Sequence, residues 1–576
     1  MIFPIRLGTL VAAVALAAPQ GIQFKAPSAR LGDVVGTIAG PLPGAPVPDA
    51  RVTLFTPGSS AFFEVRSDAS GAYAFLNVPA GAYRLGVASV GREYQEVGVQ
   101  VGPGRERVDF TLAPETHPGE WQVIGSTLPH LLDATDIGAL RPDGRILYCH
   151  DTQDPIVFDP LTGTTALFGP SGSEQGCMNT TQLEDGSILF VGGQDGSAPG
   201  SFRNAISWVK RYLPDNTWLQ LADMLAPTGR WYPGLARLND GRLLVFGGGT
   251  APNAARTDTA ELFDPATQTW SWVGSMGSAN EFAPAALLLN GRVLRTWGAN
   301  PELFDPATGL WSPAAPLVFQ HRGYPDHSDH SLLVLSDGRA LVIGQRGTGQ
   351  PPPAMTEYYD PASGLFSAGT SPGLVRYQGE VVYLPDGRVF YGAGDQGTTA
   401  GPEPNVLGIV RRCDLFDPIE ASWRRVADMP AFREYHGVTL LIPDGRVVTT
   451  GGTRIKFQVG PTTADIEAFS PPYLFRGVRP RLSGLSDATP ARGEALGFEV
   501  FPETRLTAVV LMGLQTTTHW VDGGIPRRLE LAVDQQGSSA EVILPVDPDR
   551  LPLGWYLLFG MVDDIPSEAL IVRVDL

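Results

Sequence analysis

A short turn recurs seven times through the middle of this sequence. Six copies are Asp-Gly and one is Asn-Gly, and successive copies lie 42 to 58 residues apart. The copies begin at Asp143, Asp185, Asp240, Asn290, Asp337, Asp386 and Asp444. An Asp-Gly or Asn-Gly pair between two apolar runs is a strong signal for a β-hairpin. The repeat therefore predicts a series of similar β-units between residues 115 and 475.

Most repeats continue into a second hairpin, as in ELFDPATQTW around Asp264 and ELFDPATGLW around Asp305. A period near 50 residues with four strands per unit is typical of kelch-type β-propellers. Seven turns predict seven blades across residues 115–475. The alternative is an open stack of sandwich domains, which fits the regular period and the shared Asp-Pro ending poorly.

Two further units flank the repeats. Residues 31–113 and 476–576 contain alternating apolar runs separated by Gly, Pro and Asp, a pattern that predicts β-sandwiches. The expected fold class is all-β: a seven-bladed kelch-type propeller flanked by N-terminal and C-terminal β-sandwich domains. The composition agrees, because 68 Gly and 51 Pro would interrupt helices, while 43% hydrophobic residues can form a large core.

The net charge and the N-terminal segment limit the classes of function that this chain can have. A formal net charge of −18 argues against nucleic-acid binding, which needs a basic surface. Residues 1–18 place Arg6 before an apolar run that ends in Ala15-Leu16-Ala17, the pattern of a secretory signal peptide. The alternative, a membrane anchor, needs about 20 apolar residues to span a bilayer. We therefore expect a secreted, extracellular protein without a membrane span.

The chain has only three cysteines, Cys149, Cys177 and Cys413. An odd and sparse set in a secreted protein does not form a disulfide framework, so a leftover thiol needs another explanation.

Residues that could carry chemistry converge at one position of the repeat. The innermost strand of each blade begins at one face of the central channel, and residues eight or nine places before each turn lie just before that strand. They include Cys177, Tyr232, Tyr377 and Tyr435 with His436, and the fifth repeat offers Tyr324, His327 and His330 in the segment before its turn. Each residue alone is more often a packing residue. Together they offer imidazole, phenol and thiol groups, which bind copper or iron.

The strings around these positions resemble the copper-radical oxidases, the galactose oxidase and glyoxal oxidase family. The matching pieces are Cys177 in GCMNTTQLEDG, Tyr232 in RWYPGLARLNDG, Tyr435-His436 in REYHGVTLLIPDG and His519 in TTTHWVDGG. This resemblance spans roughly residues 115–576. Residues 31–113 resemble carboxypeptidase regulatory-like domains through the segment Gly71 to Tyr83, which implies an accessory role such as glycan or cell-surface contact.

The family resemblance implies a role for each matched residue. Tyr232 would be joined to Cys177 by a thioether bond, bind one copper ion and hold a radical. His436 and His519 would be nitrogen ligands, and Tyr435 the axial ligand and the base that accepts the substrate's hydroxyl proton. His519 lies outside the propeller repeat, so its hairpin must enter the channel. The implied reaction oxidises a small aldehyde, alcohol or carbohydrate with O2 and produces H2O2.

The sequence departs from galactose oxidases in two places. Their radical is shielded by a Trp in the loop after the tyrosine blade, which here reads GGGTAPNAART. Trp231 and Trp297 are candidate replacements, although strand alternation would point Trp231 away from Tyr232. The string RWYP resembles the glyoxal oxidase branch and favours small aldehydes or simple alcohols. Candidate pocket residues are Tyr324, His327, His330, Tyr377 and Trp297.

Two other functions remain open at this stage. The chain could be a non-catalytic kelch propeller that binds glycans at the cell surface, or it could hold a structural metal without a radical. Cys177 beside Tyr232 separates the oxidase from both, because neither alternative needs that thiol next to that phenol.

Overall fold

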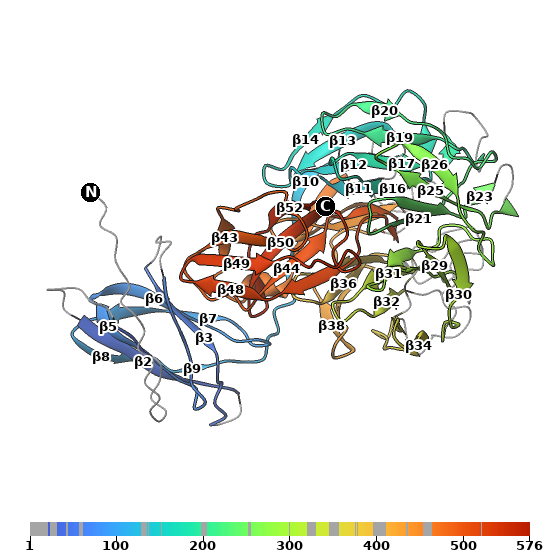
Figure 1. Ribbon diagram of the computed structural model, residues 1–576. Coiled ribbons are helices and arrows are strands. Elements are labelled where there is room, and N and C mark those ends of the chain that lie inside the picture. The colour runs from blue at the N-terminus through green and yellow to red at the C-terminus, as the bar shows by residue number, and fades with distance from the viewer. Residues whose placement is uncertain are drawn as a thin grey trace. The chain divides into compact units, whose positions relative to one another are not determined.

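The computed structural model describes most of the chain. The described residues are 21–23, 31–41, 44–56, 62–127, 135, 137–150, 152–196, 204–250, 255–298, 300–319, 330–344, 356–374, 376, 378–394, 410–433, 436–452, 464–519 and 521–576. The labelled elements are strands (Figure 1), and within the described residues the one helical element is the short 3-10 turn Pro472–Phe475. The expected all-β class is confirmed. The chain divides into two compact units, residues 1–117 with 476–478, and residues 118–475 with 479–576.

The first unit contains two β-sheets. One has the order β1 (Gly21–Gln23), β5 (Ala72–Pro79), β2 (Leu31–Ala39) and β8 (Gly104–Arg107), with β9 (Phe110–Thr111) also on β2; the other has the order β4 (Phe62–Arg66), β3 (Arg51–Phe55), β6 (Gly81–Ala88) and β7 (Gln95–Val101). Every second residue of β2 is buried, as a strand with one face on a core requires.

The second unit repeats one four-strand pattern in seven sheets of the described chain. The first three sheets contain β11 (Ile137–Leu140), β12 (Ile146–His150), β13 (Gln153–Asp159) and β14 (Thr164–Leu167); β16 (Asn179–Gln182), β17 (Ile188–Val191), β19 (Val209–Tyr212) and β20 (Trp218–Gln220); and β21 (Gly234–Arg237), β22 (Leu243–Phe246), β25 (Ala260–Asp264) and β26 (Thr269–Trp272). The fourth and fifth sheets contain β27 (Ala285–Leu287), β28 (Val293–Arg295), β29 (Glu302–Asp305) and β30 (Leu310–Pro313); and β31 (Ser331–Val334), β32 (Ala340–Ile343), β33 (Thr356–Asp360) and β34 (Leu365–Ala368). The sixth and seventh sheets contain β35 (Glu380–Tyr383), β36 (Val389–Gly392), β37 (Cys413–Asp417) and β38 (Ser422–Val426); and β39 (Gly437–Leu441), β40 (Val447–Gly451), β41 (Asp465–Ser470) and β10 (Glu120–Ser126).

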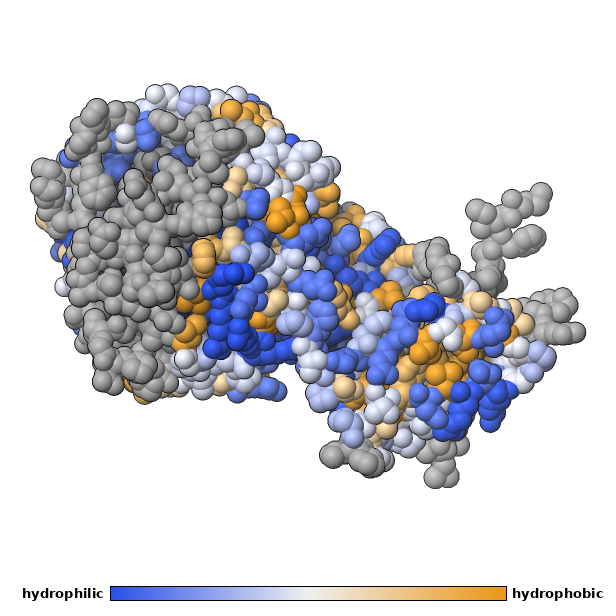
Figure 2. All heavy atoms as spheres, turned by 180° about the vertical axis from the view of Figure 1, so that it is seen from behind, coloured by the Kyte–Doolittle hydropathy of each residue, from blue (hydrophilic) through white to orange (hydrophobic). Residues whose placement is uncertain are grey.

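The strands of one sheet differ in burial according to their position. First strands such as β16 and β21 are buried at every residue, because the first strands of neighbouring sheets also contact one another. Fourth strands such as β30 and β34 are mostly exposed. Exposed apolar residues such as Leu161 and Ile419 lie in the outer turns, and polar and apolar residues are intermixed on the face shown in Figure 2.

The recurring turn joins the first two strands of each sheet. At Asp240-Gly241, the Asp240 carboxylate accepts the backbone N–H of Arg242 at 3.0 Å, and Gly241 has a φ of 86°. That φ favours glycine, as the sequence pattern indicated. The seventh sheet combines the two ends of the repeat region, because β10 pairs antiparallel with β41.

The C-terminal part of the second unit forms two more sheets. One has the order β42 (Arg481–Ser483), β43 (Ala495–Phe501), β49 (Ser539–Ile543) and β48 (Val533–Gln536); the other has the order β47 (Arg528–Leu531), β44 (Ala508–Gly513), β50 (Gly554–Val562) and β51 (Ile565–Pro566), with β52 (Leu570–Val574) also on β50. Their apolar side chains share one core, which includes Leu496, Leu511 and Leu558.

These two C-terminal sheets and their connecting segments contact the turn side of the repeats. Trp555 donates its Nε1–H to the carbonyl of Glu184 at 2.9 Å, and Arg528 donates its Nε–H to the carbonyl of Pro385 at 2.8 Å. Arg492 reaches the carbonyl of Asn239 at 2.7 Å. The three carbonyls belong to the turn regions of three different sheets.

One hairpin of the C-terminal part enters the repeat region. β45 (Thr516–Thr518) and β46 (Val521–Asp522) pair with each other, and β45 pairs antiparallel with β11, so the hairpin extends the first sheet beyond its innermost strand. Thr516 lies opposite Ala139, and Thr518 lies opposite Ile137. The hairpin therefore runs from the turn end of β11 toward its opposite end, and His519 follows at the tip.

Candidate functional site

A shared backbone bend marks the position just before the innermost strands. In five sheets, the residue eight places before the turn is not glycine and yet has a φ between 48° and 66°. These residues are Cys177, Tyr232, Phe282, Gln378 and His436. His519 at the hairpin tip also has a positive φ, 55°. Residues with side chains rarely adopt this conformation, and it is concentrated at functional sites.

Hydrogen bonds join consecutive members of this set. The backbone N–H of Tyr232 donates to the carbonyl of Cys177 at 3.1 Å, and that of Phe282 donates to the carbonyl of Tyr232 at 2.8 Å. Asn179, which is fully buried, donates its side-chain N–H to the carbonyl of Pro233 at 3.0 Å. The strand after Cys177 is thus held directly against the segment that carries Tyr232.

Three ring side chains meet where the hairpin tip reaches the strand ends. The phenolic oxygen of Tyr232 lies 3.2 Å from Nε2 of His519, and their ring centroids are 5.4 Å apart. The ring of His436 lies 4.8 Å from that of His519 in an edge-on arrangement. Tyr232 and His519 each expose 1% of their surface. One phenol and two imidazoles therefore gather in a buried position.

The orientation of His519 is set from its other side. Oγ1 of Thr518 lies 2.9 Å from Nδ1 of His519, which leaves Nε2 on the side of Tyr232. A hydrogen bond to one ring nitrogen commonly fixes which nitrogen can bind a metal.

A third imidazole, from His150, lies near this group and was not anticipated. His150 ends β12, and its ring centroid is 5.9 Å from that of His436. Its position in the second strand, instead of just before a first strand, explains why a search at fixed register missed it.

Two aromatic rings cover Tyr232. Trp231 lies 4.7 Å and Phe282 lies 4.6 Å from the Tyr232 ring centroid, and Phe282 is also 5.1 Å from the His519 ring. Strand alternation wrongly argued against Trp231, because the left-handed φ of Tyr232 breaks the extended pleat. Phe282 was not predicted, although it stands eight residues before Asn290-Gly, the same position relative to the turn as Cys177 and Tyr232.

Two candidate pocket residues have contacts elsewhere in the repeats. Trp297 packs against the apolar cluster that includes Phe304, and the Arg256 guanidinium lies 5.3 Å from its ring centroid. His330 is buried, with its Nε2 2.8 Å from Oγ1 of Thr296.

Several predicted residues lie outside the described part of the chain. They are the signal segment 1–18 and the side chains of Tyr324, His327, Tyr377 and Tyr435. Among these positions, Tyr377 precedes Gln378, which occupies the shared register of the sixth repeat.

The three cysteines, all within the described residues, form no disulfide. Cys177 is half-buried and packs against the cluster of Trp231, Tyr232, Phe282 and Val521. Cys149 and Cys413 are buried in apolar cores, and burial raises the pKa of the Cys413 thiol to about 12. Only Cys177 therefore combines partial exposure with proximity to Tyr232.

The donor set fits copper. Imidazole nitrogens and anionic oxygens suit this metal, and neighbouring ligands about 2 Å from one ion lie roughly 3 Å from each other. The 3.2 Å between Tyr232 and His519 matches that separation. Within the described chain, no three His, Cys, Asp or Glu side chains group as a metal site.

No helix in the described part of the chain is long and apolar enough to cross a membrane.

Three domain models match the chain. The carboxypeptidase regulatory-like domain matches residues 33–113, a kelch motif matches residues 236–277, and the early set domain of galactose oxidase-like proteins matches residues 479–574.

Curated relatives align with most of this chain. "Aldehyde oxidase GLOX" of Vitis pseudoreticulata is 26% identical over 527 residues, covering 78% of this chain and 96% of that protein. "Galactose oxidase" of Gibberella zeae is 21% identical, covering 72% of this chain and 63% of that protein. A WSC domain-containing protein of Arthroderma benhamiae is 25% identical, and this chain spans 45% of its length.

A solved structure has a similar fold. It is described as a fungal alcohol oxidase of the AA5 family in complex with copper, and it aligns with a TM-score of 0.65 at 20% identity, covering 80% of this chain and 100% of that one. The chain therefore resembles galactose oxidases and glyoxal-type aldehyde oxidases in sequence and fold, and it carries a galactose oxidase-like early set domain and an N-terminal carboxypeptidase regulatory-like domain.

Proposed function

We propose that this protein oxidises a primary alcohol or an aldehyde with O2 and releases H2O2, using one copper ion and a radical on Tyr232. The observation that carries the proposal is the contact of the Tyr232 phenol with the His519 imidazole at 3.2 Å, with Cys177 packed on the same cluster. Neither a glycan-binding propeller nor a structural metal site requires this combination.

Four side chains would hold the copper: Tyr232, His436, His519 and Tyr435. The positions of the first three relative to one another support this set. When bound, copper would supply a one-electron acceptor and an open coordination position for the substrate oxygen.

Cys177 and Tyr232 would form a thioether cross-link. One bond forms between sulfur and a ring carbon; the thiol hydrogen and one ring hydrogen are lost, and O2 accepts the two electrons and two protons. The backbone hydrogen bond from Tyr232 to Cys177 and the link from Asn179 to Pro233 hold the two partners close together.

The chain's own groups would divide the oxidation between them. Tyr435 would accept the hydroxyl proton of the alcohol, or of the hydrate that an aldehyde forms with water, and the Tyr232 radical would take a hydrogen atom from the carbon that bears this hydroxyl. O2 would then be reduced to H2O2 by the two electrons and two protons removed from the substrate. Trp231 and Phe282 would exclude water from the Tyr232 ring.

The substrate would be a small aldehyde or a simple alcohol. Tyr324, His327 and Tyr377 remain candidates for its pocket, while Phe282 and His150 are candidates because of their positions beside His519 and His436.

The proposed architecture closes the seven sheets into a seven-bladed propeller over residues 115–475, between β-sandwich domains at 31–113 and 476–576. The pairing of β10 with β41 supports closure. We further propose that residues 1–18 direct secretion and that the N-terminal domain contacts glycans or a cell surface.

The test combines a peroxide assay with intact-mass measurement. Purified protein is loaded with copper under O2 and assayed for H2O2 with aldehydes, primary alcohols and sugars. We expect peroxide with at least one substrate, and we expect the intact protein to lose the mass of two hydrogens. Cys177→Ser should abolish this mass loss while leaving the protein folded. Cys413→Ser is the matched control and should retain the mass loss. An unchanged mass in the wild-type protein after copper loading would refute the radical cofactor.

A further inference from the structure

The hairpin that carries His519 is closed by one carboxylate. Oδ1 of Asp522 accepts the backbone N–H of Gly524 at 2.8 Å and that of Thr516 at 3.2 Å. Thr516 begins the first strand of the hairpin, whereas Asp522 ends the second. The Gly523 N–H also donates to the Thr516 carbonyl at 2.9 Å. The carboxylate therefore ties the two strands and the following turn together.

The same network attaches the hairpin to two sheets. Gln515, which precedes β45, accepts the N–H of Leu441 on its side-chain oxygen at 2.8 Å, and its backbone carbonyl accepts the N–H of Leu140 at 3.0 Å. Leu140 ends β11 and Leu441 ends β39. Gln515 directly precedes Thr516, whose N–H the carboxylate accepts, so the segment that Asp522 holds is attached to the innermost strands of the first and seventh sheets.

Close packing on the other side leaves the hairpin little freedom. A Cβ atom added at Gly523 would lie 1.8 Å from the carbonyl oxygen of Thr180, a residue of β16. Any residue larger than glycine would therefore push the hairpin away from the second sheet.

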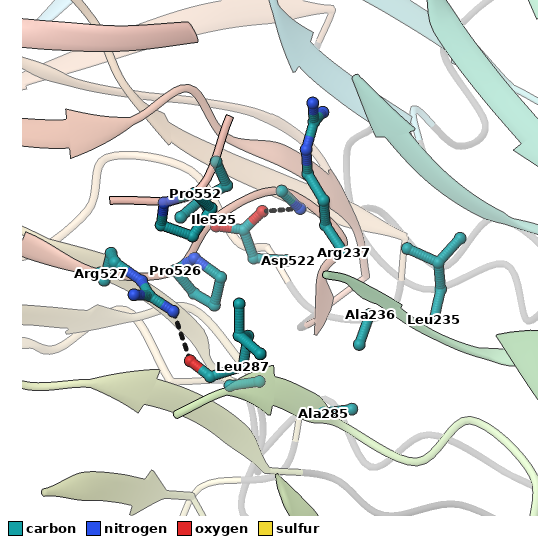
Figure 3. Close-up of a pocket in the computed structure, with 12 residues that line it drawn as sticks. Leu235, Ala236, Arg237, Ala285, Leu287, Asp522, Ile525, Pro526, Arg527 and Pro552 are labelled. Atoms are coloured by element: carbon teal, nitrogen blue, oxygen red, sulfur yellow. Dashed lines mark hydrogen bonds between the residues drawn. The ribbon is translucent and has the colours of Figure 1, made fainter. Parts of the chain in front are cut away.

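Asp522 lies in a small pocket at the base of the hairpin (Figure 3). The pocket lies between β21, β27 and the segment 522–527. Its walls include two arginines, Arg237 of β21 and Arg527 of that segment. Figure 3 shows the Arg527 guanidinium directed to the Leu287 carbonyl. Within the described residues, no arginine or lysine forms an ion pair with Asp522. Burial raises the pKa of Asp522 to about 6, whereas hydrogen bonds from Gly524, Thr516 and Gln515 lower it.

We propose that Asp522 is the positioning residue that holds the β45–β46 hairpin, and with it His519, in place beside Tyr232. It acts through the acceptor geometry of its side chain and does not itself touch the reacting atoms. The significance of this placement for copper binding rests on the proposed function, but the anchoring of the hairpin does not.

Hydrogen exchange of the full chain measures the anchoring directly. Asp522→Ala should raise the exchange rate of the amides in residues 515–524 at least tenfold, while the strands of the seven sheets keep their rates. Asp522→Asn retains a side-chain oxygen that can accept both N–H groups, so it should stay close to wild type. Asp360→Ala is the matched control, because Asp360 accepts the backbone N–H of Ala362 at 2.9 Å in an outer turn of the fifth sheet.

Copper binding supplies the second measurement. Loss of a residue that orients a metal ligand typically weakens metal affinity about 10–100-fold, so Asp522→Ala should bind copper that much more weakly by chelator competition. Its Cu(II) electron paramagnetic resonance spectrum should also lose one nitrogen coupling, and Asp522→Asn should retain both properties.

The outcomes separate this proposal from the proposed function. Unchanged exchange in Asp522→Ala, equal acceleration throughout the second unit, or an Asp522→Asn variant that behaves like Asp522→Ala would each overturn the positioning role. Failure of the wild-type protein to bind copper would overturn the proposed function, whereas the exchange rates of the hairpin would still decide the role of Asp522.

Discussion

The phenolic oxygen of Tyr232 lies 3.2 Å from Nε2 of His519, although the two residues are 287 positions apart in the sequence. Tyr232 precedes the first strand of the third sheet, and His519 is carried by a hairpin of the C-terminal part. The candidate copper site therefore exists only when the C-terminal part is docked on the repeats.

His519→Ala should greatly weaken copper binding, because it removes one of two imidazole ligands from a buried site. The expected increase in the dissociation constant is at least the roughly 10–100-fold seen for residues that merely orient a ligand, measured by chelator competition. His117→Ala is the control, since His117 belongs to the first unit. Equal copper affinity in the His519→Ala and wild-type proteins would remove His519 from the ligand set.

Tyr435→Phe should lower kcat about 10²–10⁴-fold, the usual contribution of a positioned acid or base. Because the thioether requires only Cys177 and Tyr232, the loss of two hydrogens should persist in this variant. Steady-state peroxide assays and intact-mass measurement check the two expectations separately. A variant that retains full turnover would exclude Tyr435 as the base.

Asn179→Ala should slow the formation of the cross-link. The substitution removes the hydrogen bond to Pro233 and leaves that buried carbonyl without this donor, which costs about 1–3 kcal/mol. The readout is the time course of the two-hydrogen mass loss after copper addition. A time course identical to that of wild type would show that the backbone contacts suffice to hold Cys177 and Tyr232 together.

Phe282→Ala should shorten the lifetime of the Tyr232 radical, because water gains access to a ring that Phe282 now covers at a centroid distance of 4.6 Å. Loss of this buried ring should also destabilise the second unit by about 3–5 kcal/mol. The radical is followed by its optical absorption and the stability by thermal unfolding. Phe282→Leu restores most of the side-chain volume without an aromatic ring. A normal radical lifetime in this variant would show that volume alone excludes water, whereas a short lifetime would show that the aromatic ring is required.

The contribution of Asp522 to stability should fall as pH rises from about 4 to about 6. Its pKa is raised by burial to about 6 from an ordinary value of 3.8, so over this range the folded state binds a proton that the unfolded state has released. The difference corresponds to about 3 kcal/mol. The unfolding free energy of Asp522→Asn should therefore increase relative to wild type between pH 4 and pH 7. Parallel stability profiles for the two proteins would contradict the raised pKa.

Much of the fold could be predicted from local signals. The Asp-Gly and Asn-Gly turns, the alternation of apolar residues and the period near 50 residues indicated hairpin units, because turn chemistry and pleating depend on residues close together in the chain. The same register led to Cys177, Tyr232 and His436. Applied strictly at eight residues before the turn, it would also have selected Phe282 and Gln378.

The positions of Trp231 and His150 at the candidate site depend on backbone conformation, which the pattern of residue types does not specify. The left-handed φ of Tyr232 places Trp231 against the same ring, contrary to strand alternation. His150 reaches His436 from the end of a second strand, outside the register that identified the other residues.

By itself, the sequence determined the all-β class, the repeated hairpin units and the residue types available for a copper-radical site, since these follow from local turn, strand and side-chain chemistry. Only the tertiary structure decided which of those side chains meet. The Tyr232–His519 contact requires β45 to pair with β11 and the Asp522 carboxylate to close the hairpin. Such long-range contacts depend on how separate elements pack, and no local pattern in the chain encodes that packing.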